Sequence, residues 1–436
     1  MKPSVFKGAV AHRGVVVHAL DDPLKGDYLQ HFDDGILVVD STGHVIEVGY
    51  AAQMLERMPD MEIVDHGDCF IMPGYIDTHI HYPQTGVIAS FGSQLIDWLN
   101  RYTFPAELAY GNEENAYSGA HFFINELLRN GTTTAQVFAT VHPISVDAFF
   151  TVSREHNLRM LCGKVMMDRH APEGLLDTPS SSYEQTAALI EKWHGKARLD
   201  YSVTPRFAPT STSEQLGFAG RLLEEYPSVR LHTHLSENHQ EIEWVKELFP
   251  KSMDYLDVYD QHGLVGSNSI FAHSIHLNER EWKRMGEAQS AIAFCPCSNL
   301  FIGSGLFDLA KADRHGVQTS LATDVGGGDS FSMLRVINEG YKVLQMSGQN
   351  LNAARALYLA TLGGAKALGL DNVVGNFEAG KEADFVVVDP KATPLMAHRY
   401  ALSSNFDQRL FATLMMGDDR AIKETRIMGV LAHQRD

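Results

Sequence analysis

Two histidines stand close together at the end of an apolar run in this sequence of 436 residues. In "PGYIDTHIHYPQT", which begins at Pro73, His79 and His81 are separated only by Ile80. On a β-strand, residues i and i+2 point to the same face, so a His-x-His pair aims both imidazoles at one point. Neutral imidazole is a common metal ligand. The pair therefore indicates either one edge of a metal site or two unrelated polar positions.

Other residues with metal or proton chemistry follow later apolar runs. The stretches "HTHLSE", "AHSIHL" and "ATDV" contain, in order, His232, His234, Glu237, His273, His276 and Asp324. Three histidines and one aspartate from separate strands can hold a divalent metal of the zinc type and leave a position for water. Each stretch alone is a weak signal, and the prediction depends on their joint placement.

The elements that would bring these residues together are eight β-like runs that alternate with helical stretches. The runs cover residues 69–81, 132–140, 159–168, 200–210, 229–237, 268–277, 290–299 and 317–325. Parallel strands need crossover helices, so the order predicts an α/β fold with a (β/α)8 TIM-like barrel. The chemistry of such a barrel lies at the carboxyl ends of its strands. A doubly wound open sheet is the alternative, but no G-x-G-x-x-G fingerprint follows the first strand.

Both ends of the chain read as β-structure. Residues 35–49 form two short apolar runs around a Ser-Thr-Gly turn, and residues 381–389 and 424–433 are rich in β-branched residues. These terminal segments show no long helical pattern. We therefore expect a small β-sandwich domain built from residues 1–68 and 371–436, with the barrel spanning residues 69–370.

Composition excludes several classes of partner. The chain is 44% hydrophobic and 21% charged, with a formal charge of −18, which is typical of a soluble globular protein. Such a charge argues against binding a nucleic-acid backbone, though not against a nucleobase without phosphate. We expect no signal peptide, no membrane segment and no disulfide framework, because the apolar runs are short and only four cysteines occur. The expected location is the cytoplasm.

Several of these stretches carry a family resemblance. "PGYIDTHIH", "HTHLSE", "AHSIHL", "LATDV" and "GKEADFVVVD" resemble the amidohydrolase superfamily of metal-dependent hydrolases and deaminases. "HYPQ", "DWLNRYTFPAE", "RNGTTTAQVFATVH" and "TPRFAPTS" more narrowly resemble the guanine deaminases. The resemblance runs through nearly the whole chain. It implies a barrel fused to a small β-sandwich, a homodimer, and one zinc ion per chain. It also implies that a zinc-activated water converts guanine to xanthine and ammonia in purine catabolism or salvage.

The resemblance also assigns metal ligands. It makes His79, His81, His234 and Asp324 the zinc ligands, whereas His232 matches no ligand position and reads as a strand residue on the same side. Many superfamily members carry a carbamylated lysine on strand four that bridges two metals. This sequence has Arg206 and Phe207 there, so one metal is expected. Lys164, at the end of strand three, is the alternative bridging lysine, and iron is the alternative to zinc.

Three residues are expected to act in the reaction. Asp324 can accept the proton of the water or hold that water in line. Glu237, three residues past His234, is placed to carry a proton to the ring nitrogen and then to the leaving ammonia. His273 would stabilise charge at the attacked carbon, whereas His276 is expected to be structural. The alternative for Glu237 is an acidic residue at a helix start, which the helix dipole favours.

Hydrogen-bond donors are expected to recognise the substrate. The guanidinium of Arg206 and the amide of Gln84 would donate to guanine O6, and Phe207 would lie against the purine face. The alternatives are a surface ion pair for Arg206 and a satisfied loop amide for Gln84. Together with the metal and catalytic groups, the expected substrate contacts are His81, Gln84, Arg206, Phe207, His234, Glu237, His273 and Asp324.

Other signatures and functions compete with this interpretation. Deaminases of bases in nucleic acids use H-x-E followed by P-C-x-x-C. The chain has His239 and Glu241 in the first motif, but Leu300 replaces the second cysteine of the other. Cys295 and Cys297 read as core residues on a buried strand that could line the pocket. A ring-opening hydantoinase or dihydroorotase would need two metals, and a non-enzymatic barrel would be expected to have lost ligands.

Overall fold

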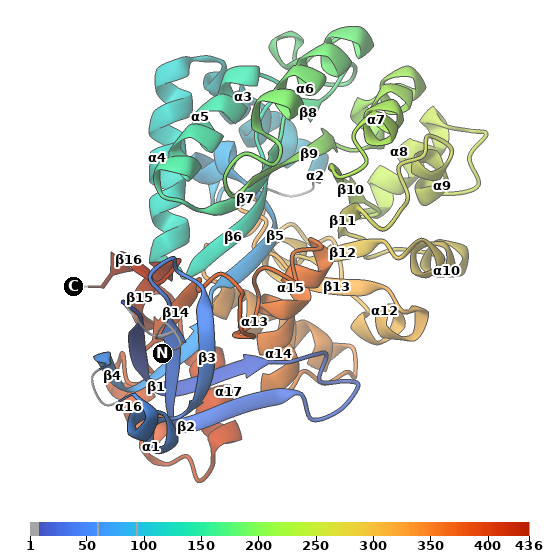
Figure 1. Cartoon of the computed structure of the whole chain (residues 1–436). Coiled ribbons are helices and arrows are strands. Elements are labelled where there is room, and N and C mark those ends of the chain that lie inside the picture. The colour runs from blue at the N-terminus through green and yellow to red at the C-terminus, as the bar shows by residue number, and fades with distance from the viewer. Residues whose placement is uncertain (1–7, 59–60, 93–94, 436) are drawn as a thin grey trace.

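The computed structural model describes residues 8–58, 61–92 and 95–435, and it shows a barrel beside a separate sheet (Figure 1). Eight parallel strands pair in the order β13-β12-β11-β10-β9-β7-β6-β5. Their bounds are β5 Tyr75–His81, β6 Thr132–Phe138, β7 Arg159–Gly163, β9 Leu199–Pro205, β10 Arg230–Leu235, β11 Ser269–His273, β12 Ala291–Phe294 and β13 Gln318–Leu321. The short strand β8, Val165–Met166, pairs with β9. The predicted (β/α)8 barrel is confirmed.

The first and last strands of the barrel, β5 and β13, are joined just beyond the end of β13. The amide of Asp324 donates to the carbonyl oxygen of His79 at 3.0 Å, and the amide of His81 donates to that of Val325 at 2.8 Å. Deeper in the barrel, the hydroxyls of Thr78 and Ser320 are 2.8 Å apart. These contacts join β5 to the segment after β13, so the first and last strands of the barrel become neighbours.

Helices cover the outside of the barrel (Figure 1). Those that connect its strands are α4 Glu113–Arg129, α5 Pro143–Glu155, α6 Pro179–Trp193, α7 Ser213–Glu225, α8 His239–Leu248, α9 Tyr255–Asp260, α10 Glu279–Ala288, α11 Pro296–Phe301 and α12 Leu309–His315. Local sequence defines their starts: Thr178 and Ser181 form a reciprocal capping box at α6, as do Asn278 and Glu281 at α10. After the barrel come α13 Met333–Met346, α14 Ala353–Ala360 and α15 Leu362–Ala367.

Between β5 and α4 the chain crosses the carboxyl ends of the strands in a series of short turns. These are the 3-10 helix η1 Tyr82–Val87, α2 Leu95–Trp98, the π-helical turn η2 Leu99–Thr103, α3 Phe104–Leu108 and η3 Ala109–Gly111. The stretch includes the peculiar "DWLNRYTFPAE" of the sequence. It places both apolar side chains and one buried carboxylate, that of Glu107, above the barrel.

Both chain ends build the second sheet. Its order is β16-β15-β14-β4-β1-β2-β3, with bounds β1 Val10–Ala19, β2 Leu29–Val39, β3 Val45–Tyr50, β4 Glu62–Pro73, β14 Phe385–Val388, β15 Ile422–Ile427 and β16 Val430–Gln434. The separate small β-structure from the two chain ends is thus confirmed, whereas the domain boundaries stay a prediction. The expectation of a single strand over residues 69–81 is wrong, because β4 pairs with β1 and β14 and only β5 enters the barrel.

Two other sequence expectations are wrong. The terminal segments do contain helices, namely α1 Ala51–Arg57, α16 Pro394–Ala401 and α17 Phe406–Met416. In α17, Phe406, Leu410 and Leu414 recur at a spacing of four and are buried, and Asn405 caps the start, so a helical signal was present. Cys297 lies in α11 rather than on a strand, because β12 ends at Phe294 before Pro296 starts that helix.

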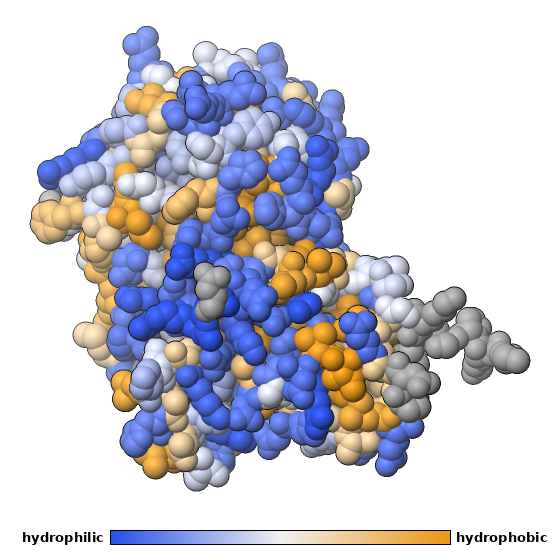
Figure 2. Space-filling model, turned by 90° about the vertical axis from the view of Figure 1, so that its left-hand side faces the viewer, coloured by the Kyte–Doolittle hydropathy of each residue, from blue (hydrophilic) through white to orange (hydrophobic). Residues whose placement is uncertain are grey.

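The surface is mostly polar. On the face shown in Figure 2, hydrophilic residues surround several separate hydrophobic areas. Within the described ranges, no helix combines the length and the apolar character needed to cross a membrane.

Candidate metal centre and active site

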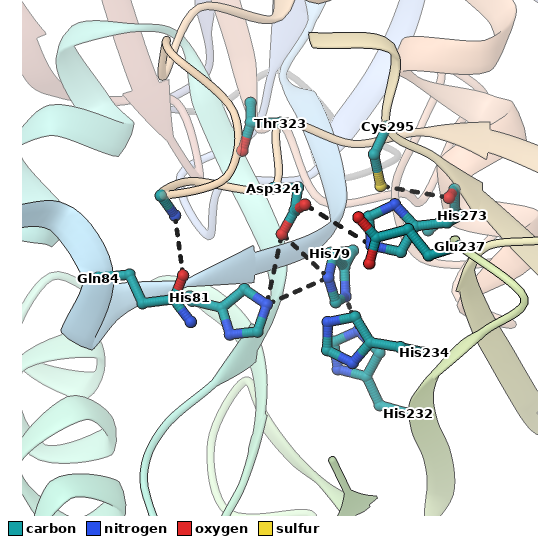
Figure 3. A network of polar contacts seen from close by, with 12 residues as sticks. His79, His81, Gln84, His232, His234, Glu237, His273, Cys295, Thr323 and Asp324 are labelled. Atoms are coloured by element: carbon teal, nitrogen blue, oxygen red, sulfur yellow. Dashed lines mark hydrogen bonds and ion pairs between the residues drawn. The ribbon is translucent and has the colours of Figure 1, made fainter. Parts of the chain in front are cut away.

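Four side chains from three strand ends converge at the carboxyl end of the barrel (Figure 3). His79 and His81 end β5, His234 lies in β10, and Asp324 follows β13. The Nε2 atoms of His79 and His81 are 3.2 Å apart, and Asp324 Oδ1 lies 3.2 Å from the first and 3.3 Å from the second. One ligand atom from each of the four residues lies within 4.8 Å of the others. They are the four residues that the family resemblance assigns as zinc ligands.

The hydrogen bonds of the imidazoles leave lone pairs at the centre of this group. His234 Nδ1 is 2.8 Å from the carbonyl oxygen of Arg206 and must donate to it, which leaves Nε2 as an acceptor. Burial lowers the pKa of His81 to about 3 and that of His234 well below its ordinary value, so both rings are neutral. Burial alone would raise the pKa of Asp324, but His79 and His81 hold it well below its usual range. Neutral imidazoles around an ionised carboxylate fit a divalent cation.

His232 has a role that the sequence did not reveal. Its Nε2 lies 2.8 Å from Nδ1 of His79, and both side chains are fully buried. With Nε2 of His232 accepting a hydrogen bond from Nδ1–H of His79, the Nε2 lone pair of His79 faces the other three residues. Such an outer partner fixes the tautomer and the orientation of a ligand ring. The sequence did contain one sign of this role: His232 lies two residues before His234 on the same strand, so both rings point to the same face.

Glu237 and His273 lie beside Asp324. His273 Nε2 is 3.4 Å from Glu237 Oε2 and 3.7 Å from Asp324 Oδ2. Ser304 donates to Glu237 Oε1 at 3.1 Å, and the side-chain oxygen of Asn299 is 2.8 Å from Nδ1 of His273. Burial, followed by the charge of Asp324, raises the pKa of Glu237 to about 8. A carboxyl with a pKa near neutrality can both accept and donate a proton.

The backbone is strained at two of these residues. His273 has a φ of 66° and Asp324 a φ of 50°, both in the left-handed region that non-glycine residues rarely adopt. Strain of this kind persists where surrounding contacts over-determine it, and it gathers at functional sites. The neighbouring Asp77 supplies such contacts, since it accepts from the amides of Thr323 and His79 at 3.1 and 3.2 Å.

A pocket of about 400 Å³, counted to its mouth, opens above the four ligands. The residues that line it are His81, Gln84, Leu95, Trp98, Leu99, Arg206, Phe207, His234, Glu237, His273, Ile302, Asp324 and Gly327. All eight residues expected to contact the substrate are therefore in its wall. Leu95, Trp98, Leu99 and Ile302 are apolar additions that the sequence interpretation missed.

Arg206 does not form a surface ion pair. Its side chain is 3% exposed, and its Nη1 donates to both carboxylate oxygens of Glu107, at 2.8 and 2.9 Å. Gln84, also buried, donates from Nε2 to Glu107 Oε1 at 3.0 Å. Glu107 belongs to "DWLNRYTFPAE", so its motif was noticed in the sequence while its role was not.

Two other sequence candidates have different roles. Lys164 is fully buried, forms an ion pair with Asp177 and is not among the residues that line the pocket. Cys295 is buried close to His273 and Asp324, outside the pocket wall, and burial raises the pKa of its thiol well above the ordinary value. Cys297 is buried in the core.

Comparison with known proteins gives consistent matches. The sequence profile of the amidohydrolase family matches residues 70–431. A guanine deaminase of Escherichia coli (strain K12) is 51% identical over 423 residues, which cover 97% of this chain and 96% of that protein. The structure of E. coli guanine deaminase superposes with a TM-score of 0.94 at 50% identity, over 98% of this chain and 99% of the other. A guanine deaminase from C. acetobutylicum with bound guanine gives a TM-score of 0.89 at 29% identity, over 97% and 99% of the two chains.

Proposed function

The chain belongs to the amidohydrolase family, and from that premise we propose that it catalyses the hydrolytic deamination of guanine to xanthine and ammonia. The observation that supports the proposal is one pocket whose wall contains three of the four converging metal-ligand candidates, the proton carrier Glu237 and two buried donors. The relatives that match across nearly the full chain carry the name of this activity.

His79, His81, His234 and Asp324 would hold one zinc ion per chain. Their fit rests on the convergence of ring nitrogens and a carboxylate oxygen within 4.8 Å. A bound zinc ion lowers the pKa of water from about 16 towards 7 and so supplies a nucleophile at neutral pH. The three rings come from β5 and β10, two rigid strands, which fixes their directions.

Glu237, Asp324 and His273 would move the protons. Asp324 accepts a proton from the attacking water or holds that water in line. Glu237 carries a proton from Oε2 to the ring nitrogen and then to the leaving amine, with Ser304 keeping its other oxygen in place. His273 faces both carboxylates through Nε2 and stabilises the charge that develops at the attacked carbon.

Arg206 and Gln84 would read the carbonyl edge of the base. Guanine O6 is an acceptor, and both side chains have donors in the pocket wall. Phe207 and the apolar residues of the wall would lie against the purine ring. Excluding water from such a site strengthens the hydrogen bonds that remain.

The competing functions have less support. A ring-opening amidohydrolase would need a second metal and a bridging lysine, whereas the ammonium of Lys164 is paired with Asp177. A scaffold without chemistry would not need all four ligand residues in one place. Zinc in preference to iron, the cytoplasmic location and the homodimer stay predictions, as does the absence of nucleic-acid and membrane partners.

The test is a substrate panel on the zinc-loaded protein. Guanine, adenine, cytosine and a hydantoin are incubated separately, while ammonia release and the ultraviolet spectrum are followed. We expect guanine to be the only good substrate, because sites built on substrate hydrogen bonds discriminate by about 10⁴–10⁵. Comparable rates on adenine or cytosine would contradict the roles of Arg206 and Gln84. Opening of the hydantoin without ammonia would favour the ring-opening alternative.

A further inference from the structure

One carboxylate behind the pocket wall contacts both side chains that are proposed to read the base. Glu107 is fully buried in α3 and is not among the residues that line the pocket. Its oxygens accept one hydrogen bond from Gln84 Nε2 and two from Arg206 Nη1. Gln84, Glu107 and Arg206 come from three separate segments, η1, α3 and the end of β9.

The contact determines which way the Gln84 amide points. A carboxylate only accepts, so it requires the NH2 end of Gln84 on its side. At the other end, Gln84 Oε1 accepts from the amide of Gly326 at 3.3 Å, and a backbone N–H only donates. Neither neighbour tolerates the amide turned by 180°.

The same contact holds Arg206 in place. A buried guanidinium without a partner is strongly unfavourable, and Glu107 neutralises it at the back of the pocket. The ring of Phe104, from the same turn of helix, lies 5.5 Å from the guanidinium carbon. Within the part of the chain that the structure describes, the guanidinium donates through Nη1 alone, which leaves Nε–H and Nη2–H for a ligand.

We propose that Glu107 is a positioning residue that determines substrate specificity by fixing the orientation of the Gln84 amide and of Arg206. Guanine presents an acceptor, O6, next to a donor, N1–H. A purine with an amino group at C6 presents a donor next to an acceptor. A freely turning amide would pair with either edge, whereas the fixed amide pairs with one. The inference rests on the proposed deamination of guanine.

The substrate pair for the test is guanine and 2,6-diaminopurine. Both carry the amine at C2 that would leave, and they differ only at the edge that Gln84 and Arg206 would read. The measured quantity is the ratio of kcat/KM for guanine to kcat/KM for 2,6-diaminopurine, together with zinc content and melting temperature.

In Glu107→Gln, which keeps the shape but can also donate, we expect the guanine KM to rise and this ratio to fall about tenfold or more, at unchanged zinc content. Glu107→Asp stays an acceptor but is one methylene shorter. It should raise the guanine KM and keep the ratio within about threefold of the wild type. Glu114→Gln, at an exposed position of α4, is the matched control and should change neither quantity.

The outcomes separate the possibilities. The inference would be overturned if the ratio of the two kcat/KM values were unchanged in Glu107→Gln, or if it fell equally in Glu107→Gln and Glu107→Asp. Damage to packing alone lowers kcat/KM for both substrates alike and leaves their ratio unchanged. If Glu107→Gln does not fold, Glu107→Asp provides the test. An unchanged guanine KM in that variant, or a kcat/KM ratio that falls by more than about threefold, would contradict the inference. A wild-type protein that releases no ammonia from guanine would instead contradict the proposed function.

Discussion

At the scale of single residues, Glu237 is set apart from the other acidic groups by its neighbours. It is buried next to a second carboxylate, yet it is not among the four residues whose atoms converge as metal ligands. Ser304 holds one of its oxygens, and the other faces His273. Its position just before α8 would also suit a helix-start residue, but Glu241 fills that role by accepting from the amides of Glu237 and Asn238.

Glu237→Gln should therefore separate binding from chemistry. We expect the variant to retain its metal and to bind guanine while kcat falls by roughly 10²–10⁴, the usual contribution of a positioned acid–base group. Steady-state kinetics with metal analysis checks this. Glu243→Gln, on the exposed side of α8, is the control. Normal turnover by Glu237→Gln would leave the proton transfers to Asp324 and His273.

At the scale of elements, the site depends on strand ends that are far apart in the sequence. β5 supplies two rings, β10 one ring, and the segment after β13 the carboxylate. Backbone hydrogen bonds between Asp324 and His79, and between His81 and Val325, hold the first and last of these together. The barrel closes at this point, which holds the residues proposed as metal ligands next to one another.

Removing one ligand should empty the site. We expect the purified wild-type protein to hold about one zinc ion per chain, and His79→Ala or Asp324→Ala to lose both metal and activity, because zinc is held jointly by its few side-chain ligands. Elemental analysis with activity assays measures both. His121→Ala, at an exposed position of α4, controls for loss of a histidine. A content near two metals per chain in the wild type would contradict the mononuclear site.

At the scale of the whole molecule, buried charges join the barrel to the terminal sheet. Arg198, just before β9, donates to Glu382 at 2.7 Å and also contacts Asp384, both next to β14. Arg159 of β7 donates to the same Glu382 at 2.7 Å. Burial by itself raises the pKa of Asp384, and the charge of Arg198 opposes that rise.

Arg198→Met should therefore destabilise the molecule in a pH-dependent way. Breaking a buried pair by removing one partner costs about 3–5 kcal/mol of unfolding free energy. The folded-state pKa of Asp384 is raised and would rise further without Arg198, so the loss should be smallest at acidic pH and should grow as pH rises through that pKa. Melting curves at two pH values measure it.

The matched control for this prediction is Arg221→Met. Arg221 pairs with Glu225 on the exposed surface of α7, where ion pairs contribute about 0–1 kcal/mol. An equal effect of the two substitutions, or a loss from Arg198→Met that does not change with pH, would contradict the role given to Asp384.

The sequence by itself determined the barrel and the separate terminal β-structure, and its resemblance to the amidohydrolase family selected the four residues proposed as metal ligands. Alternating strand and helix patterns are local, and His-x-His on a strand needs only the period of two to point both rings one way. The same locality explains the errors at residues 69–81 and at Cys297, since a buried apolar run does not reveal which sheet it joins or where a helix begins.

Only the tertiary structure decided how the site is supported. His232 behind His79, Asn299 behind His273, and Glu107 behind Gln84 and Arg206 are contacts between segments 23 to 153 positions apart. No local pattern marks such a partner, because its role depends on where another strand or turn ends in space. Burial acts in the same way. The pKa and the hydrogen-bonding direction of a buried carboxylate or imidazole depend on neighbours that only the fold brings together.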